Sequence, residues 1–109
     1  MSDTPVKTPT KPAGRPATRP GRKTERPRLH KVILVNDDFT PREFVVMVLK
    51  AVFRTTEEEA FRIMLTAHQK GVCVVAVFPR DIAETKATEA TDLGREGGFP
   101  LMFTTEPEE

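Results

Sequence analysis

The sequence contains no tryptophan, no tyrosine and only one cysteine, Cys73, among its 109 residues. A single cysteine cannot form a disulfide within the chain and offers no second thiol to a metal, so we expect a buried, reduced thiol in a cytoplasmic protein. No apolar run approaches the roughly 20 residues that a membrane-spanning helix needs. The N-terminal residues also lack the apolar region of a secretory signal. We therefore expect neither a membrane protein nor a secreted one.

Proline and charge are distributed unevenly along the chain. Residues 1–28 hold six of the ten prolines and carry a formal net charge of +6, from eight basic and two acidic residues. Residues 29–109 carry −5, from nine basic and fourteen acidic residues. Because the first segment has too few apolar side chains to offset its ordering entropy, we expect a disordered basic extension. One folded domain should follow at 29–105, with a frayed acidic C-terminus at 106–109.

The basic extension fits either a solvated tether or a nucleic-acid or ribosome-associated binding module. It has no aromatic residue to stack on bases and no regular spacing of its basic residues, which argues against nucleic acid. Composition alone leaves both interpretations open.

From Leu29 onward the pattern predicts alternating strands and helices. Thr40 with Glu43, and Thr56 with Glu59, each match a capping box that begins a helix, and Gly71 is the expected end of the second helix. The predicted strands are residues 31–36, 72–78 and 100–105. The predicted helices are residues 41–53 and 57–70, and a third that begins near residues 79–81 and ends at Gly94 or at the Gly97-Gly98 pair.

The order β-α-α-β-α-β restricts the sheet. Two helices separate the first two strands, which should run antiparallel, and one helix separates the last two, which should run parallel. A three-stranded sheet ordered 2-1-3 satisfies both conditions. Strands two and three are parallel but lie on opposite edges, so every neighbouring pair is antiparallel, and the most apolar strand lies in the middle. With all three helices on one face, the prediction is a two-layer α/β domain.

A polar triplet, Asn36-Asp37-Asp38, follows the most apolar strand just before a helix begins. Asn and Asp are common turn residues that bond their own backbone, which is the simplest explanation of the triplet. His68 stands one turn after Met64 on the second helix, where a lone histidine is more often a surface residue than a ligand-binding group.

The same polar groups would also suit a cation attached to a hydrophobic group. An apolar surplus around Val45, Met64 and Leu101 could leave a small cavity beside them. The α-amino group of a peptide fits such a site, because it offers three donors and a positive charge. A neutral imidazole and the Asn36 carbonyl would accept hydrogen bonds, and Asp38 would supply charge.

Other chemistry fits the sequence less well. Asp37, Asp38 and His68 match no zinc-site spacing. A hydrolase would need a nucleophile, but Ser2 lies in the extension and Cys73 inside a strand, without a glycine motif for an oxyanion hole. We therefore expect no metal, no cofactor and no catalysis.

The segments KVILVNDDFTPREFVV, IMLTAHQKG, VFPRDIAETK and FPLMFTT, in this order, resemble the bacterial ClpS family over about residues 29–105. The resemblance implies the β-α-α-β-α-β fold and a cytoplasmic, non-enzymatic adaptor of the N-degron (N-end rule) pathway. Such adaptors bind substrates whose first residue is Phe, Leu, Tyr or Trp. They deliver these substrates to the ClpA-type AAA+ unfoldase and the ClpP protease. We expect a monomer that binds no nucleic acid.

The resemblance also implies roles for individual residues. Asn36, Asp38 and His68 match the residues that hold the substrate's α-amino group, with Asp38 acting through water. Asp37, beside them, is assigned to the same α-amino site. The pocket for the first side chain is matched by Leu34, Thr40, Val45, Met64, Ala67 and Leu101, with Arg42 at its rim.

Asp81 and Lys86 match an acidic and a basic chaperone contact at the start of the third helix, and the N-terminal extension matches a segment that engages the unfoldase. Two pocket positions depart from the family pattern. Arg42 replaces a common Met and Ala67 a common Val, so we expect a relaxed or shifted preference among large first residues.

Overall fold

The computed structural model describes residues 28–108, so the predicted disordered extension lies, apart from Arg28, outside the described residues. The described part follows the predicted order β-α-α-β-α-β. Its elements are β1 (Leu29–Val35), α1 (Arg42–Phe53), α2 (Glu57–Lys70), β2 (Val72–Pro79), α3 (Arg80–Glu96) and β3 (Met102–Pro107).

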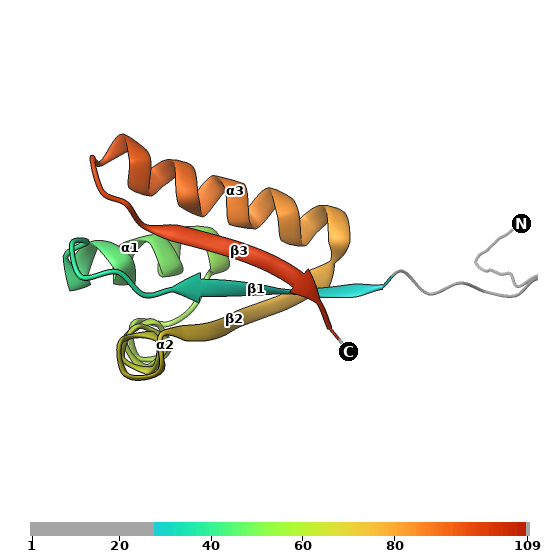
Figure 1. Cartoon of the computed structure of the whole chain (residues 1–109), viewed down its shortest axis with the longest axis horizontal. Helices are drawn as coiled ribbons and strands as arrows, with labels where there is room; N and C mark the ends of the chain where they lie inside the picture. The colour runs from blue at the N-terminus through green and yellow to red at the C-terminus, as the bar shows by residue number, and fades with distance from the viewer. Residues whose placement is uncertain (1–27, 109) are drawn as a thin grey trace, which may run out of the picture.

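Within this part the strands form one antiparallel sheet in the order β2-β1-β3, which confirms the predicted topology (Figure 1). The central place suits β1, because Val32, Ile33 and Leu34 are all buried and only a strand with neighbours on both sides can be covered so fully. A β-bulge between Val32 and Ile33 shifts the pairing of β1 with β2.

The helices form the second layer (Figure 1). Helix α2 packs on β2, and α3 packs on all three strands, most extensively on β3. Helix α1 packs against α2 and α3 and reaches the sheet through Phe53, whose ring centroid lies 5.6 Å from that of Phe103 on β3. Between the layers Val48 and Leu49 are fully buried, and burial of one such side chain contributes about 1.5–3 kcal/mol. This packing accounts for the apolar character of α1 on nearly every side.

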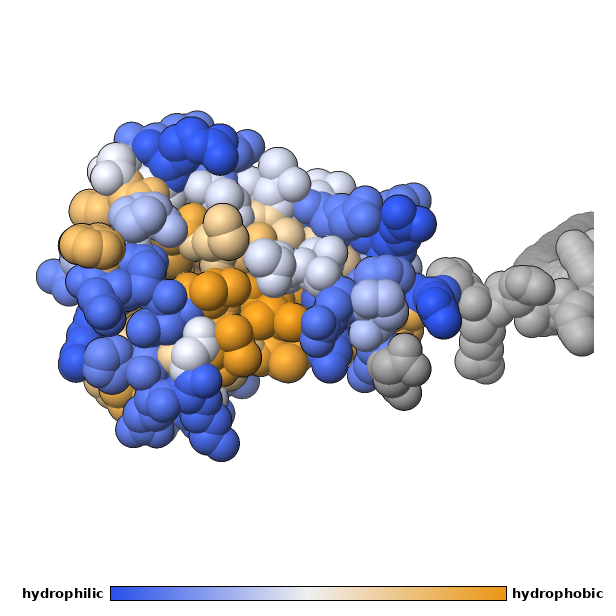
Figure 2. Space-filling view, viewed as in Figure 1, coloured by the Kyte–Doolittle hydropathy of each residue, from blue (hydrophilic) through white to orange (hydrophobic). Residues whose placement is uncertain are grey.

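The other face of the sheet has no helix over it within the described residues. Val72, Val74 and Met102 are each about half exposed there. Figure 2 shows apolar side chains gathered over the strands on this face.

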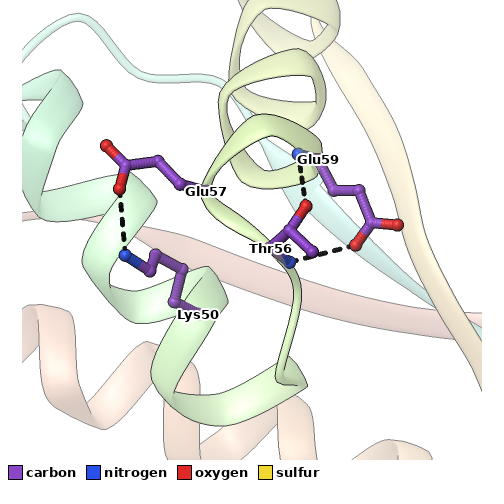
Figure 3. Close-up of polar contacts among 4 residues, drawn as sticks. All are labelled: Lys50, Thr56, Glu57 and Glu59. Carbon is purple, nitrogen blue, oxygen red and sulfur yellow. Dashed lines mark hydrogen bonds and ion pairs between the residues drawn. The ribbon is translucent and has the colours of Figure 1, made fainter.

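The second helix begins as its sequence predicts. The Glu59 N–H donates to Thr56 Oγ1 at 3.0 Å, and the Thr56 N–H donates to Glu59 Oε1 at 3.1 Å, which completes a capping box (Figure 3). Lys50 Nζ lies 3.1 Å from Glu57 Oε1 and joins the last turn of α1 to the first turn of α2. Gly71 ends α2 with a φ of 94°, a conformation that favours glycine.

The capping box predicted for α1 is wrong. Pro41 occupies the cap position of α1 and provides no side-chain hydrogen bond. Thr40 instead donates its hydroxyl to the carboxylate of Asp37, at 3.0 Å to Oδ1 and 2.9 Å to Oδ2. The helix begins one residue later than predicted, with Pro41 at its cap, so Thr40 lies before the helix and its hydroxyl bonds within the loop.

The predicted fraying from residue 106 is contradicted at its start, because β3 extends through Glu106 and Pro107. Pairing with β1 explains the extra length. Glu106 lies opposite Lys31 and forms an ion pair with it at 3.4 Å. The Glu108 N–H donates to the Leu29 carbonyl at 2.9 Å.

Cys73 also differs from its prediction, since its side chain is half-buried rather than buried. Position 73 lies on β2, an edge strand, where only one neighbour covers the chain.

Candidate functional site

A cavity of about 300 Å³ lies where the C-terminal end of β1 meets the start of α1 and the end of α2. The loop of residues 36–41 forms one side of it, and Leu101, just before β3, forms another. Its walls are made by Leu34, Val35, Asn36, Asp37, Asp38, Phe39, Thr40, Pro41, Arg42, Val45, Met64, Ala67, His68 and Leu101.

Every residue predicted from the sequence for the amine clamp or the side-chain pocket lines this cavity. The structure thus brings together side chains from position 34 to position 101, while their roles stay predictions. Three lining residues were missed. Phe39 and Pro41 lie within the predicted loop, and Val35 lies next to it. Their position close to the polar triplet is the sequence feature that could have identified them as lining residues.

The inner wall of the cavity is apolar and buried. Leu34 reaches it from the helix-facing side of β1, and Val45 from the first turn of α1. Met64 and Ala67, three residues apart on α2, present the same helix face to it. The exposed fractions of these four residues are 2%, 7%, 5% and 1%, so the wall is almost fully shielded from bulk solvent.

Leu101 completes the wall because α3 approaches it closely at Gly94. A Cβ atom on Gly94 would lie 2.7 Å from the Cβ of Leu101, which no real pair of atoms tolerates. The Phe99 N–H donates to the Gly94 carbonyl at 2.8 Å, and the Phe103 N–H donates to Thr91 Oγ1 at 3.0 Å. These contacts fix the segment that carries Leu101 against α3.

The outer rim of the cavity is polar. The Asn36 N–H donates to the carbonyl of Gly71 at 2.9 Å, which ties the end of β1 to the end of α2. This bond places Asn36 and His68 on the same cavity, although 32 positions separate them in the sequence. Asn36 is half-buried, and Asp38 and His68 are exposed. An amide, a carboxylate and an imidazole therefore surround the mouth of an apolar hollow.

Asp37 differs from its polar neighbours because the loop itself occupies its carboxylate. Oδ1 accepts the N–H groups of Phe39 and Thr40, both at 2.8 Å, and both oxygens contact the Thr40 hydroxyl. These bonds favour a positioning role for Asp37, which shapes the loop between Asn36 and Arg42, over the amine contact expected from the sequence.

The predicted chaperone contacts lie away from the cavity, on α3. Asp81 is exposed in the first turn of this helix. Lys86 Nζ donates to the carbonyl of Val52 at 3.1 Å and thereby holds α3 to the end of α1. A cation at the C-terminal end of a helix also interacts favourably with the helix dipole.

The thiol of Cys73 lies outside the cavity. Burial raises the pKa of the Cys73 thiol above its usual value, while the Lys70 ammonium and a hydrogen bond with Thr66 oppose the rise. Within residues 28–108 no three side chains of His, Cys, Asp or Glu gather in a metal-binding arrangement. None of the described helices is long and apolar enough to cross a lipid bilayer.

Comparison with known proteins gives consistent findings. The family model for the ATP-dependent Clp protease adaptor protein ClpS matches residues 25–104. The ClpS 2 adapter of Agrobacterium fabrum is 63% identical over 109 residues, which is 100% of both chains. The ClpS 1 adapter of Bradyrhizobium diazoefficiens is 71% identical over 87 residues, or 80% of this chain and 86% of the relative.

A solved structure also matches the fold. It shows Agrobacterium tumefaciens ClpS2 bound to L-phenylalaninamide, with a TM-score of 0.75 and 70% sequence identity. The match covers 76% of this chain and 100% of the solved one.

Proposed function

The chain belongs to the ClpS family of ATP-dependent Clp protease adaptors, and from this premise we propose that its cavity binds the N-terminus of N-degron substrates. The rim holds the free α-amino group, and the apolar hollow takes a large hydrophobic first side chain: Phe, Leu, Tyr or Trp. The protein then delivers the bound substrate to the ClpA unfoldase and the ClpP protease. It acts as a monomer and performs no catalysis of its own.

One observation carries this proposal: the polar groups and the apolar wall predicted separately from the sequence line one cavity. A volume of about 300 Å³ is enough for a single large side chain. The ligand of the Agrobacterium tumefaciens relative supports the proposal. L-phenylalaninamide has a free amino group, a benzyl side chain and an amide in the place of the first peptide bond, so it stands in for an N-terminal phenylalanine.

The two halves of the cavity have to act together. Burial of a Phe- or Leu-sized side chain contributes about 1.5–3 kcal/mol. A charge-assisted hydrogen bond to the ammonium contributes about 1.5–3 kcal/mol more. Either contribution alone corresponds to very weak binding once the cost of association is subtracted. Selectivity for a free N-terminus with a large first residue follows, because only such a ligand supplies both.

Each rim residue has a distinct part in the clamp. The Asn36 side-chain carbonyl and the neutral imidazole of His68 accept hydrogen bonds from the ammonium. Asp38 provides the compensating negative charge through water, which suits its exposed position. Asp37 keeps the loop in shape without contacting the ligand.

Comparing a free peptide with its acetylated form tests the clamp. We expect a fluorescent peptide that begins with Phe to bind in an anisotropy titration, and the same peptide with an acetylated N-terminus to lose binding. Acetylation removes the charge and adds bulk at the rim. A peptide that begins with Ala serves as the control for the apolar wall. Equal affinity for the free and acetylated peptides would refute the clamp.

Delivery needs a separate assay. A reporter protein that begins with Phe should be degraded by ClpA and ClpP faster in the presence of this chain. The exposed Asp81 is the proposed acidic contact with the unfoldase, so Asp81→Arg should slow degradation. Affinity for the Phe peptide, measured in parallel, shows whether the cavity of the variant is intact. A degradation rate that does not depend on the adaptor would exclude ClpA as the partner.

A further inference from the structure

One charged side chain at the cavity has no part in the proposed clamp. Arg42, the first residue of α1, is exposed and lines the cavity. The ion pairs within residues 28–108 join other side chains and leave Arg42 without an acidic partner from that part of the chain. Asp37 bonds within the loop, to Phe39 and Thr40, and forms no ion pair with Arg42.

The size of the cavity decides what can reach Arg42. Ligand pockets range over about 300–1,000 Å³, and this one, at about 300 Å³, lies at the lower limit. A cavity of this size accommodates one large side chain. Since successive side chains of an extended polypeptide point in opposite directions, the second side chain of a bound substrate projects outward over the rim.

The rim offers that second side chain both a cation and an apolar surface. Phe39 lines the same cavity and is 78% exposed, an unusual position for an aromatic ring in a folded domain. A guanidinium forms a planar fork that matches a carboxylate in two parallel hydrogen bonds. Asp38 is the remaining rim carboxylate. In the proposed clamp the substrate ammonium offsets its negative charge, so Asp38 repels an acidic second residue less than an unpaired carboxylate would.

We propose that Arg42 and Phe39 form a subsite for the second residue of the substrate and that it favours glutamate. The Arg42 guanidinium binds the carboxylate, and the Phe39 ring covers the methylene groups. This inference rests on the proposed function, because it presumes that the first side chain fills the cavity. The net charge of −5 on residues 29–109 would by itself favour a basic second residue. The subsite therefore predicts tighter binding of an acidic than of a basic second residue, whereas attraction by the net charge alone predicts the reverse.

Three peptides that differ only at the second position test the subsite: Phe-Glu-, Phe-Gln- and Phe-Lys-. An exposed ion pair is weak, so we expect the full-length protein to bind Phe-Glu- about two- to fivefold tighter than Phe-Gln-. Phe-Lys- should bind more weakly than Phe-Gln-. The difference should shrink at high salt, where the screening length falls to about 3 Å at 1 M.

Variants assign the preference to one side chain. Because Arg42 also lines the cavity, the ratio of affinities between peptides is the readout, not the affinity itself. In Arg42→Gln the affinities for Phe-Glu- and Phe-Gln- should become equal. In Arg42→Glu the Phe-Gln- peptide should bind more tightly, and in Arg42→Lys part of the preference for Phe-Glu- should remain. Arg62 supplies the matched controls, since it is exposed on α2 outside the cavity: Arg62→Gln changes the net charge as Arg42→Gln does, and Arg62→Glu as Arg42→Glu does.

The outcomes separate the subsite from the clamp. Equal binding of Phe-Glu- and Phe-Gln- by the unaltered protein, or a preference that survives Arg42→Gln, overturns the subsite. If the preference is lost in Arg62→Gln as well as in Arg42→Gln, it comes from overall charge, and the subsite is again overturned. If acetylated Phe-Gln- binds as well as the free peptide, the proposed function itself fails. Binding that needs the free amine but ignores the second residue removes the subsite alone.

Discussion

Asp37→Ala removes the one carboxylate that organises the loop between β1 and α1. In the native loop this carboxylate accepts two N–H groups, from Phe39 and Thr40, and the Thr40 hydroxyl, at 2.8 to 3.0 Å. The loop carries Asn36 and Asp38, which the proposed clamp uses. The substitution should therefore reduce both the stability of the domain and its affinity for substrate.

The size of the effect follows from the contacts. Loss of a capping side chain costs about 0.5–2 kcal/mol. Because Asp37 is only half-buried, water can hydrate the freed N–H groups, and the full cost of unsatisfied buried donors, about 1–3 kcal/mol, does not apply. We expect the free energy of unfolding to fall by about 1–2 kcal/mol, which lowers the melting temperature of a domain of this size by about 4–8 °C per kcal/mol.

Urea unfolding and peptide titration of the same variants measure the two effects. Asp37→Asn keeps one oxygen acceptor and should lose about half as much stability as Asp37→Ala. In a double-mutant cycle, Asp37→Ala and Thr40→Val should be non-additive, with a coupling energy of about 0.5–3 kcal/mol for residues in one network. Affinity for the Phe peptide should fall by up to about tenfold. The loss follows because only the fraction of molecules whose loop keeps the native conformation can bind.

A different pattern would refute the positioning role. If Asp37→Ala leaves the free energy of unfolding within about 0.3 kcal/mol of the native value yet abolishes peptide binding, the carboxylate contacts the ligand directly. The amine contact implied by the family resemblance would then replace the positioning role inferred from the loop.

Three further substitutions or treatments test other parts of the site. His68→Ala should weaken Phe-peptide binding about tenfold or more without changing stability, because a charge-assisted hydrogen bond of about 1.5–3 kcal/mol is lost; Gln69→Ala, its exposed neighbour outside the cavity, should bind normally. Gly94→Ala should cost about 1–3 kcal/mol of stability and weaken binding, because the new methyl group displaces Leu101. An unchanged melting temperature and affinity would show that α3 can shift to accommodate the methyl group without cost. Since burial raises the pKa of the Cys73 thiol, iodoacetamide at pH 8 should alkylate it more slowly than free cysteine, and urea should remove the difference.

Much of the fold follows from short-range patterns. The Thr56 and Glu59 capping box depends on atoms three residues apart, so the sequence is enough to predict it. The central place of β1 follows from its apolar run, because only a strand with neighbours on both sides and a helical layer over it can bury such a run.

Other local predictions failed where two neighbouring residues can take the same position. Thr40 and Pro41 can each precede the first turn of α1, and the sequence pattern favours threonine as the cap. In the structure Pro41 is the cap, and the Thr40 hydroxyl donates to Asp37 instead. The extension of β3 through Glu106 likewise depends on a partner far away in sequence, Lys31, which no local pattern reveals.

The sequence by itself determined the order of the elements and the chemical types available for a site, because periodicity, caps and residue identity are local properties. Only the tertiary structure decided that Asn36 and His68 share a cavity, that Gly94 lets α3 set Leu101 in its wall, and that Arg42 stands at its rim. The physical reason is that a cavity exists between elements. Its shape depends on how closely helices and strands approach, and that distance is set by the packing of residues far apart in the chain.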